Sequence, residues 1–437
     1  MEELFESVVT KWQSLQRAEP AEFASSGEAR LRANHAQLLS QDLSSDEAAL
    51  IALIRQGPTP ASRELALDLV DSLLPASRPL KSRAVWAAVL TALAAGFALK
   101  LPSLFFESGS GDSGTFYLRN AALLLLPFSV LYFAFLGRLK PRWWLLLAAG
   151  LVVGVSMANL LPWQSGGKAE LLFGLHLPVA LLPLLALAML DDQWRDVEAR
   201  LRFVRFCVEW FVLLSLVALG GGVLLGLLTA LLSQVGIGVD LVWQWLVVVA
   251  AGGAFVLTSA MAAGAARFVA GASTLLARIF VPLFALMLAG FFTVVLATGR
   301  FAEFDRNLLF TFDAVLLIVS VLTLYACATR NPLALPHWQD WALLALAVVA
   351  VLVDVFALGS TLIRVWDLGW TANRTAAIGL NLVLLVNLVG SAFLLGRFTL
   401  GSHRFEAVLN WQTRYLPVHF AWAAAVCAVF PLAFGLN

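Results

Sequence analysis

Apolar runs of about 20 residues recur along most of this 437-residue chain, and they restrict its fold more than any other feature. A run of that length, wound as an α-helix, crosses a hydrocarbon layer of ~30 Å. Within such a layer every backbone N–H and C=O group needs an internal partner, which a helix supplies. The sequence therefore predicts an all-α, polytopic transmembrane helical bundle. We expect about eleven spans, at residues 84–104, 119–137, 143–162, 171–190, 207–232, 243–264, 277–298, 309–328, 339–358, 376–397 and 418–436.

Composition supports a membrane protein and excludes several other classes. Hydrophobic residues make up 60% of the chain and charged residues 13%, against about 45–50% and about 25% in soluble domains. The 29 basic and 28 acidic residues leave a net charge of +1, which excludes a nucleic-acid binder. The three cysteines (Cys207, Cys327 and Cys427) lie inside apolar runs and form no CxxC pair, so we expect no metal site and no cofactor. Motifs for nucleotide, zincin or serine hydrolysis are missing from the sequence, and this favours a non-enzymatic role.

Residues 1–80 differ from the rest because they are rich in acids and contain no long apolar run. Short amphipathic patterns with capping residues predict four helices there, at residues 2–16, at 26–40, from Ser44 to Gly57, and after Thr59. We expect a small cytosolic helical domain at 1–80, followed by the transmembrane domain at 81–437. This prefix domain would contact a cytosolic or membrane protein partner.

Basic residues are distributed unequally between the two sets of connections. With the N-terminus in the cytoplasm, the inner connections carry 16 of them: Arg78, Lys81, Arg83, Arg138, Lys140, Arg142, Arg195, Arg200, Arg202, Arg205, Arg267, Arg278, Arg330, Arg397, Arg404 and Arg414. The outer connections carry six: Arg119, Lys168, Arg300, Arg306, Arg364 and Arg374. Cytoplasmic loops are enriched in Lys and Arg, so this ratio predicts a membrane protein with its N-terminus inside and its C-terminus outside.

Tryptophan and glycine add expectations about the spans. Ten tryptophans fall at span ends, where indole rings favour the membrane interface: Trp86, Trp143, Trp144, Trp163, Trp210, Trp243, Trp245, Trp338, Trp341 and Trp411. Two GxxxG pairs, Gly150 with Gly154 and Gly222 with Gly226, allow close helix approach. We interpret both pairs as packing positions inside the bundle.

Charged residues within apolar spans are costly and are candidates for function. Glu209 lies in the first turn of the fifth span, where Arg205 is its expected partner. Asp313 and Asp354 lie about one turn inside the outer ends of the eighth and ninth spans, and therefore at similar depth in the outer leaflet. Asn159, His176 and Asn381 fall in the same layer.

The expected outer loop after the ninth span, GSTLIRVWDLGWTANR, adds Arg364, Asp367 and Arg374. Arg374 opposes the dipole at a helix N-terminus, so an acidic partner is expected for it, either Asp367 or Asp354. One hypothesis is a polar vestibule that faces the periplasm, built from Asn159, His176, Asp313, Asp354, Arg364, Asp367 and Arg374. The alternative is a set of separate ion pairs that hold helix ends and a long loop.

The junction before the tenth span carries a motif: Arg364, then Gly369, Trp370, Thr371, Asn373 and Arg374. It resembles the arginine followed by Gly-hydrophobic-Thr-x-Asn-Arg of bacterial polytopic proteins in the domain-of-unknown-function 4153 family. The resemblance implies an inner-membrane protein whose activity is not established, and it implies that Gly369, Thr371 and Asn373 form a defined structure. Three functions remain open: a permease-like or accessory membrane component, an envelope enzyme acting on a lipid-linked substrate, and a membrane scaffold or signalling protein.

Overall fold

The structure is a computed structural model that describes residues 29–37, 51–52, 82–106, 112–137, 139–164, 166–234, 242–264, 266–298, 306–332 and 334–435. Every regular element within these ranges is a helix. The chain divides into two compact units, residues 1–81 and residues 82–437. In the first unit residues 29–37 are helical, inside the helix expected at 26–40. The other helices expected before residue 80 lie outside the described residues, except for the helical residues 51 and 52.

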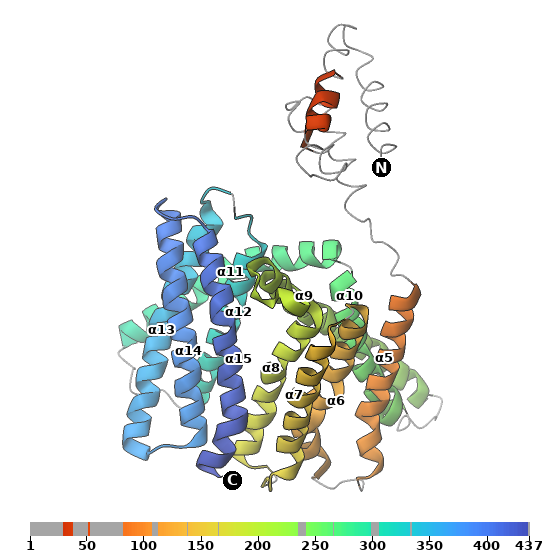
Figure 1. Ribbon diagram of the computed structural model, residues 1–437. Coiled ribbons are helices and arrows are strands. Elements are labelled where there is room, and N and C mark those ends of the chain that lie inside the picture. The colour runs from red at the N-terminus through yellow and green to blue at the C-terminus, as the bar shows by residue number, and fades with distance from the viewer. Residues whose placement is uncertain are drawn as a thin grey trace. The chain divides into compact units, whose positions relative to one another are not determined.

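Among the described residues, eleven helices are long and apolar enough to cross a membrane, in agreement with the expected number of spans. Figure 1 shows how they are arranged. The long helices are α5 (Ser82–Lys100), α6 (Asp112–Leu136), α7 (Pro141–Leu160), α8 (Lys168–Leu190), α9 (Val197–Gln234), α10 (Val248–Gly264), α11 (Ala266–Thr298), α12 (Arg306–Thr329), α13 (Trp338–Leu368), α14 (Ala372–Thr399) and α15 (Glu406–Phe434). Three short elements adjoin them: the 3₁₀-helices η1 (Leu101–Leu104) and η2 (Asp191–Arg195), and the π-helix η3 (Val242–Val247).

Two hydrophobic clusters form the core of the second unit. The first is built mainly from α6 to α9, with contributions from α5 and α10, and contains Phe173 and Leu185. The second is built mainly from α11 to α15 and contains Leu316, Leu346 and Leu384. The two halves meet where α8 packs against α15, side by side in Figure 1. The acids that the sequence singles out, Asp313 and Asp354, therefore belong to the second half.

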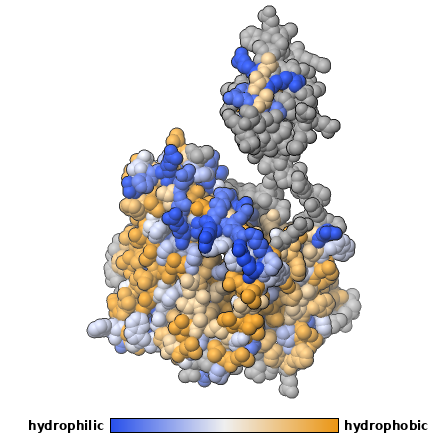
Figure 2. Space-filling model, viewed as in Figure 1, coloured by the Kyte–Doolittle hydropathy of each residue, from blue (hydrophilic) through white to orange (hydrophobic). Residues whose placement is uncertain are grey.

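On the face of the second unit that Figure 2 shows, most of the lower surface is apolar (orange), with the hydrophilic (blue) side chains gathered toward one end. Large side chains such as Phe211, Leu231 and Leu286 are exposed on the second unit, as expected for helices that contact lipid. The connections that precede α7, α9, α13 and α15 lie together at one end of the bundle. We call this the basic end, because it carries Lys140, Arg142, Arg195, Arg330 and Arg404. The end that holds the α7–α8 and α13–α14 connections is called the distal end.

The largest difference from the expected spans lies between α13 and α14. The sequence predicted a helix that ends at residue 358 and a long loop up to Arg374. In the structure α13 continues to Leu368 and α14 begins at Ala372, so the connection is only residues 369–371. Arg364 and Asp367 are therefore on a helix, because charged side chains are compatible with a helix that continues beyond the hydrocarbon layer. Likewise α11 begins at Ala266, eleven residues before the expected span at 277–298.

The two GxxxG pairs behave differently. A Cβ at Gly150 would lie 2.9 Å from Leu184, and one at Gly154 would lie 3.0 Å from Leu123, so this pair packs inside the bundle as predicted. A Cβ at Gly222 or Gly226 would meet no described atom within 4 Å. The prediction of internal packing is wrong for the second pair, because that stretch of α9 contacts no other described helix closely.

Two of the ten tryptophans expected at the interface are used for packing instead. Trp210 is buried in the bundle and donates hydrogen bonds to the Phe255 carbonyl (3.1 Å) and to Thr258 (3.2 Å). Trp411 lies against Gly390 and donates to the Asn387 carbonyl at 3.1 Å. A hydrogen bond from the indole N–H to a buried acceptor replaces the hydrogen bond to water that the membrane interface would provide.

Candidate functional site

An acidic site lies between α12, α13 and α14, in the second half of the bundle. Asp354 of α13 is fully buried, with 0% exposure, and neither carboxylate oxygen has a hydrogen-bond partner among the described residues. Asp313 of α12 is half-buried and interacts electrostatically with Asp354. It also lies within reach of the Asn381 amide of α14, whose polar atoms are buried and make no well-formed hydrogen bond. Three helices thus place two acids and one amide together, and no basic residue in the described part of the chain forms an ion pair with them.

The depth of Asp354 follows from the tryptophans on the same helix. Trp341 lies near one end of α13 and Trp366 near the other, and both are exposed. They are 25 residues apart (366 − 341), which is about 37 Å of helix. Tryptophan favours the two interfaces of the membrane, and this length is enough to reach both sides of a hydrocarbon layer of ~30 Å. Asp354 lies 13 residues from Trp341 and 12 from Trp366, and therefore near the middle of the layer.

This depth corrects the position expected from sequence. Asp354 was expected about one turn inside the outer end of its span, because the span was expected to end at residue 358. Since α13 ends at Leu368, Asp354 lies 14 residues, or about four turns, from that end. Asp313 lies seven residues, or about two turns, inside α12. Asp354 is therefore farther from its helix end than predicted, whereas Asp313 lies four residues, or about one turn, after Leu309, where the apolar span begins.

Electrostatics makes an ionised Asp354 unfavourable in this setting. A carboxylate without partners in a low-dielectric interior costs many kcal/mol and becomes neutral or recruits a cation. Polar side chains continue from the acids along α12, where Ser320 and Thr323 are buried seven and ten residues after Asp313, on the same helix face. The site is therefore suited to hold a proton or a small cation, and it has polar neighbours on the side of the basic end.

Two members of the predicted vestibule are placed apart from the acids. Asn159 of α7 forms a reciprocal pair with Asn120 of α6, in which each amide donates to the other at 2.8 and 3.1 Å. His176 of α8 is hydrogen-bonded through Nδ1 to the carbonyl oxygen of Leu172, one turn earlier, at 2.8 Å. Both residues make contacts within the first half of the bundle, and no described contact joins them to Asp313 or Asp354.

The turn between α13 and α14 is a defined structure at the distal end. Gly369 ends α13 with a φ of +78°, a conformation that glycine adopts without strain. Thr371 precedes α14 as its N-cap, and its hydroxyl accepts the backbone N–H of Arg374 at 3.4 Å. Asn373, half-buried, lies in the first turn of α14. Asp367 is exposed on the last turn of α13, and Arg364, half-buried, lies one turn before it.

The partner of Arg374 differs from the expected acid. Its guanidinium donates to the carbonyl oxygens of Leu368 (3.0 Å) and Gly369 (2.7 Å), at the C-terminus of α13. Helix C-termini present unsatisfied carbonyls and partial negative charge, so they can take the place of a carboxylate. The expectation of Asp367 or Asp354 as the partner is therefore wrong. Arg374, Gly369 and Thr371 act together to close the turn.

Two buried ion pairs were missed from sequence. At the distal end Glu170 of α8, with 0% exposure, accepts the Gly166 backbone N–H at 2.8 Å. Its other oxygen lies 3.2 Å from the Nε atom of Arg119 of α6, which is partly exposed, as an ion pair without hydrogen-bond alignment. Glu209 is buried at 5%, and the expected Arg205 acts on it as a nearby charge while forming its ion pair with Glu198. In the sequence, Glu170 is recognisable only as an acid in the first turn of an apolar span, and this does not reveal its partner.

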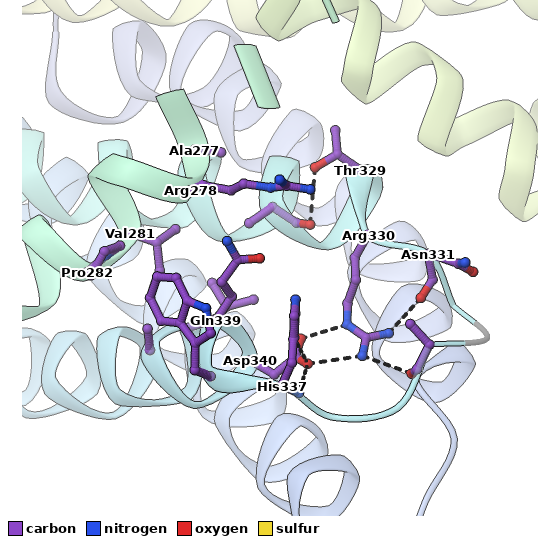
Figure 3. A pocket seen from close by; sticks show the side chains of 15 residues that line it. Ala277, Arg278, Val281, Pro282, Thr329, Arg330, Asn331, His337, Gln339 and Asp340 are labelled. Carbon is purple, nitrogen blue, oxygen red and sulfur yellow. Dashed lines mark hydrogen bonds and ion pairs between the residues drawn. The ribbon is translucent and has the colours of Figure 1, made fainter. Parts of the chain in front are cut away.

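The second missed pair lies at the basic end, at the connection between α12 and α13. Arg330 and Asp340 are joined by two contacts, Nε–Oδ1 at 2.6 Å and Nη2–Oδ2 at 3.0 Å, and both side chains are almost fully buried. His337 caps α13 and contacts Asp340 through its ring at 2.6 Å. The Arg330 guanidinium also lies over the rings of Phe398 and Phe405. Figure 3 shows this cluster bordering a cavity.

A polar network lies between the acids and the basic end. Gln412 of α15 donates to the Ser391 hydroxyl of α14 at 2.7 Å, and Asn387 donates to Gln412 at 3.4 Å. These three side chains are buried and satisfy one another, unlike Asp354.

Similarity to known proteins assigns no family or function to this chain. No protein-family model matches the chain, and no curated protein and no solved structure is similar to it. The resemblance at Gly369–Arg374 therefore stays a prediction. Among the described residues no group of three His, Cys, Asp or Glu side chains is placed to hold a metal ion.

Proposed function

We propose that this chain is a permease-like protein of a bacterial inner membrane, oriented with its N-terminus inside. Its site at Asp313 and Asp354 would open toward the periplasm and carry a proton or a small cation. The observation that supports this proposal is Asp354: a fully buried carboxyl group with two unpartnered oxygens, near the middle of an apolar helix. Ionisable groups inside membranes are costly and commonly mark proton or ion pathways.

The prefix domain, residues 1–80, completes the proposal. Its acidic composition and amphipathic patterns suit a surface that binds a cytosolic or membrane protein partner. The chain would then act as a carrier, or as an accessory component of a larger transport complex.

A membrane scaffold is the second candidate, and a specific observation favours it. Asn159 and Arg374 of the predicted vestibule are engaged in contacts that hold helices together. In a scaffold the acids at α12–α13 would be neutral packing groups. The two functions differ in whether Asp313 and Asp354 can be reached from water.

Accessibility of single cysteines separates these functions. Cys207, Cys327 and Cys427 are first replaced by Ala, and Asp313→Cys or Asp354→Cys is added to this background. Membrane vesicles of known orientation are then treated with an impermeant thiol reagent from the periplasmic side. We expect Asp313→Cys to react and Asp354→Cys to react more slowly, because Asp354 is deeper. Leu346→Cys, at a fully buried apolar position of the same helix, is the matched control and should not react.

A second measurement tests the proton or cation itself. Hydrophobic carbodiimides modify protonated carboxyl groups, and mass spectrometry locates the adduct. We expect an adduct at Asp354 that decreases as the pH rises or when a competing monovalent cation is added. The carrier proposal fails if neither Asp313→Cys nor Asp354→Cys reacts with the impermeant reagent. It also fails if the carbodiimide leaves Asp354 unmodified although a membrane-permeant thiol reagent reaches Asp354→Cys, because the position is then accessible and the carboxyl group is not protonated.

A further inference from the structure

A cavity of about 260 Å³ lies at the basic end, where α11, the end of α12 and the start of α13 meet. In Figure 3, Arg278 extends toward it from α11, while His337 and Gln339 reach toward it from the start of α13. Arg330 and Asp340 close one side.

The charge around the cavity is positive in sum. Arg330 and Asp340 neutralise each other, because they form the buried ion pair. Arg278 is exposed, and no described residue forms an ion pair or hydrogen bond with it. His337 adds no negative charge in either protonation state. The cavity therefore offers a guanidinium without an acidic partner.

The start of α13 adds backbone donors beside this cation. The first turn of a helix leaves N–H groups without an intrahelical partner, and the dipole of the 31-residue α13 adds partial positive charge there. The N–H groups of Trp338 and Gln339, which both line the cavity, have no described acceptor. Guanidinium and helix N-terminal N–H groups together are the usual donors for a phosphate group.

The other side of the cavity is apolar and continues into the surface that faces lipid. Val281, Pro282 and Leu343 line it, and the neighbouring α11 residues Ile279 and Phe280 are exposed beside it. A ligand that fills this space would carry a phosphate toward Arg278 and hydrocarbon toward α11. Basic pockets between helices at the membrane surface bind such headgroups.

We propose that this cavity binds the phosphate group of an anionic phospholipid headgroup, with Arg278 as its principal charged contact. The acidic site of α12–α14 plays no part in this inference. A free phosphate ion would offer the same chemistry to Arg278, and the experiment separates the two sources.

The test compares binding of phosphatidylglycerol, of uncharged diacylglycerol and of inorganic phosphate to the purified full chain in a neutral detergent. Native mass spectrometry counts the lipids bound, and thermal unfolding reports protection by phosphate. Arg278→Gln removes the proposed contact, and Ala342→Trp fills the cavity. Arg404→Gln is the matched control, because Arg404 is an exposed arginine at the same end and does not line the cavity.

We expect phosphatidylglycerol to bind and diacylglycerol to be at least fivefold weaker. Arg278→Gln and Ala342→Trp should each weaken phosphatidylglycerol binding at least fivefold, and Arg404→Gln should leave it unchanged. Protection by inorganic phosphate alone, lost in Arg278→Gln, would identify the source as free phosphate. The proposal is overturned if Arg278→Gln and Ala342→Trp bind both probes as the unmodified chain does.

Discussion

Asp354 and Asp340 lie on the same buried face of α13, yet replacing each of them by leucine should change stability in opposite directions. A buried polar group without a partner costs about 1–3 kcal/mol, so Asp354→Leu should leave the free energy of unfolding unchanged or raise it by that amount. Asp340→Leu removes the partner of Arg330, whose side chain is only 7% exposed. Breaking a buried ion pair costs about 3–5 kcal/mol. The Arg330 guanidinium keeps the carbonyl oxygens of Asn331, Ala334 and Leu335 as acceptors, so we expect a loss at the lower end of that range.

Thermal unfolding in detergent micelles measures the difference. A thiol-reactive fluorescent dye reports unfolding through Cys327 and Cys427, which are both buried in the native state. We expect Asp340→Leu to lower the melting temperature by several degrees, and Asp354→Leu to keep or raise it while abolishing carbodiimide labelling. Asp354→Asn controls for side-chain size. A loss of stability in Asp354→Leu as large as that in Asp340→Leu would refute the reasoning, since it would mean that Asp354 has a structural partner.

Two further predictions use the same melting assay. Gly379→Ala should lower stability by about 1–3 kcal/mol, because its Cβ would lie 1.9 Å from the Trp422 ring. Gly290→Ala, whose Cβ would meet no described atom within 4 Å, should raise stability by up to ~1 kcal/mol, and equal effects of the two changes would contradict the packing. Glu170→Gln should cost about 1.5–3 kcal/mol, since it removes the charged partner of Arg119, and an unchanged melting temperature would mean that the pair contributes nothing.

The number of spans was predictable because it depends on local composition. An apolar run of about 20 residues has few alternatives to a membrane-spanning helix, whatever its neighbours are. Helix ends were less predictable, as α13 illustrates. Hydropathy locates the hydrocarbon layer, but a helix continues past it until a residue such as Gly369 ends it. Asp354 was therefore found by its residue type, but its distance from the helix end was predicted too short.

Pairing between helices could not be read from the sequence. Asp354 is conspicuous because it interrupts an apolar run, whereas Glu170 and Arg330 lie at span ends, where charges are ordinary. Whether such a charge is paired depends on which helix lies beside it, as α6 does beside Glu170. The glycines show the same limit: Gly150 and Gly222 have the same spacing motif, and only the neighbour in the fold distinguishes them.

The two acids of α13 together indicate how the proposed carrier would work. Asp340 and Asp354 are 14 residues apart, close to four turns, so they share one buried face, and only Asp340 is neutralised by an arginine. A neutral, protonated Asp354 is compatible with closed packing among α12, α13 and α14, whereas an ionised one requires a cation or water beside it. Gain or loss of one proton or cation would therefore favour different arrangements of these three helices. That difference is what a carrier needs in order to couple an ion to a change of conformation.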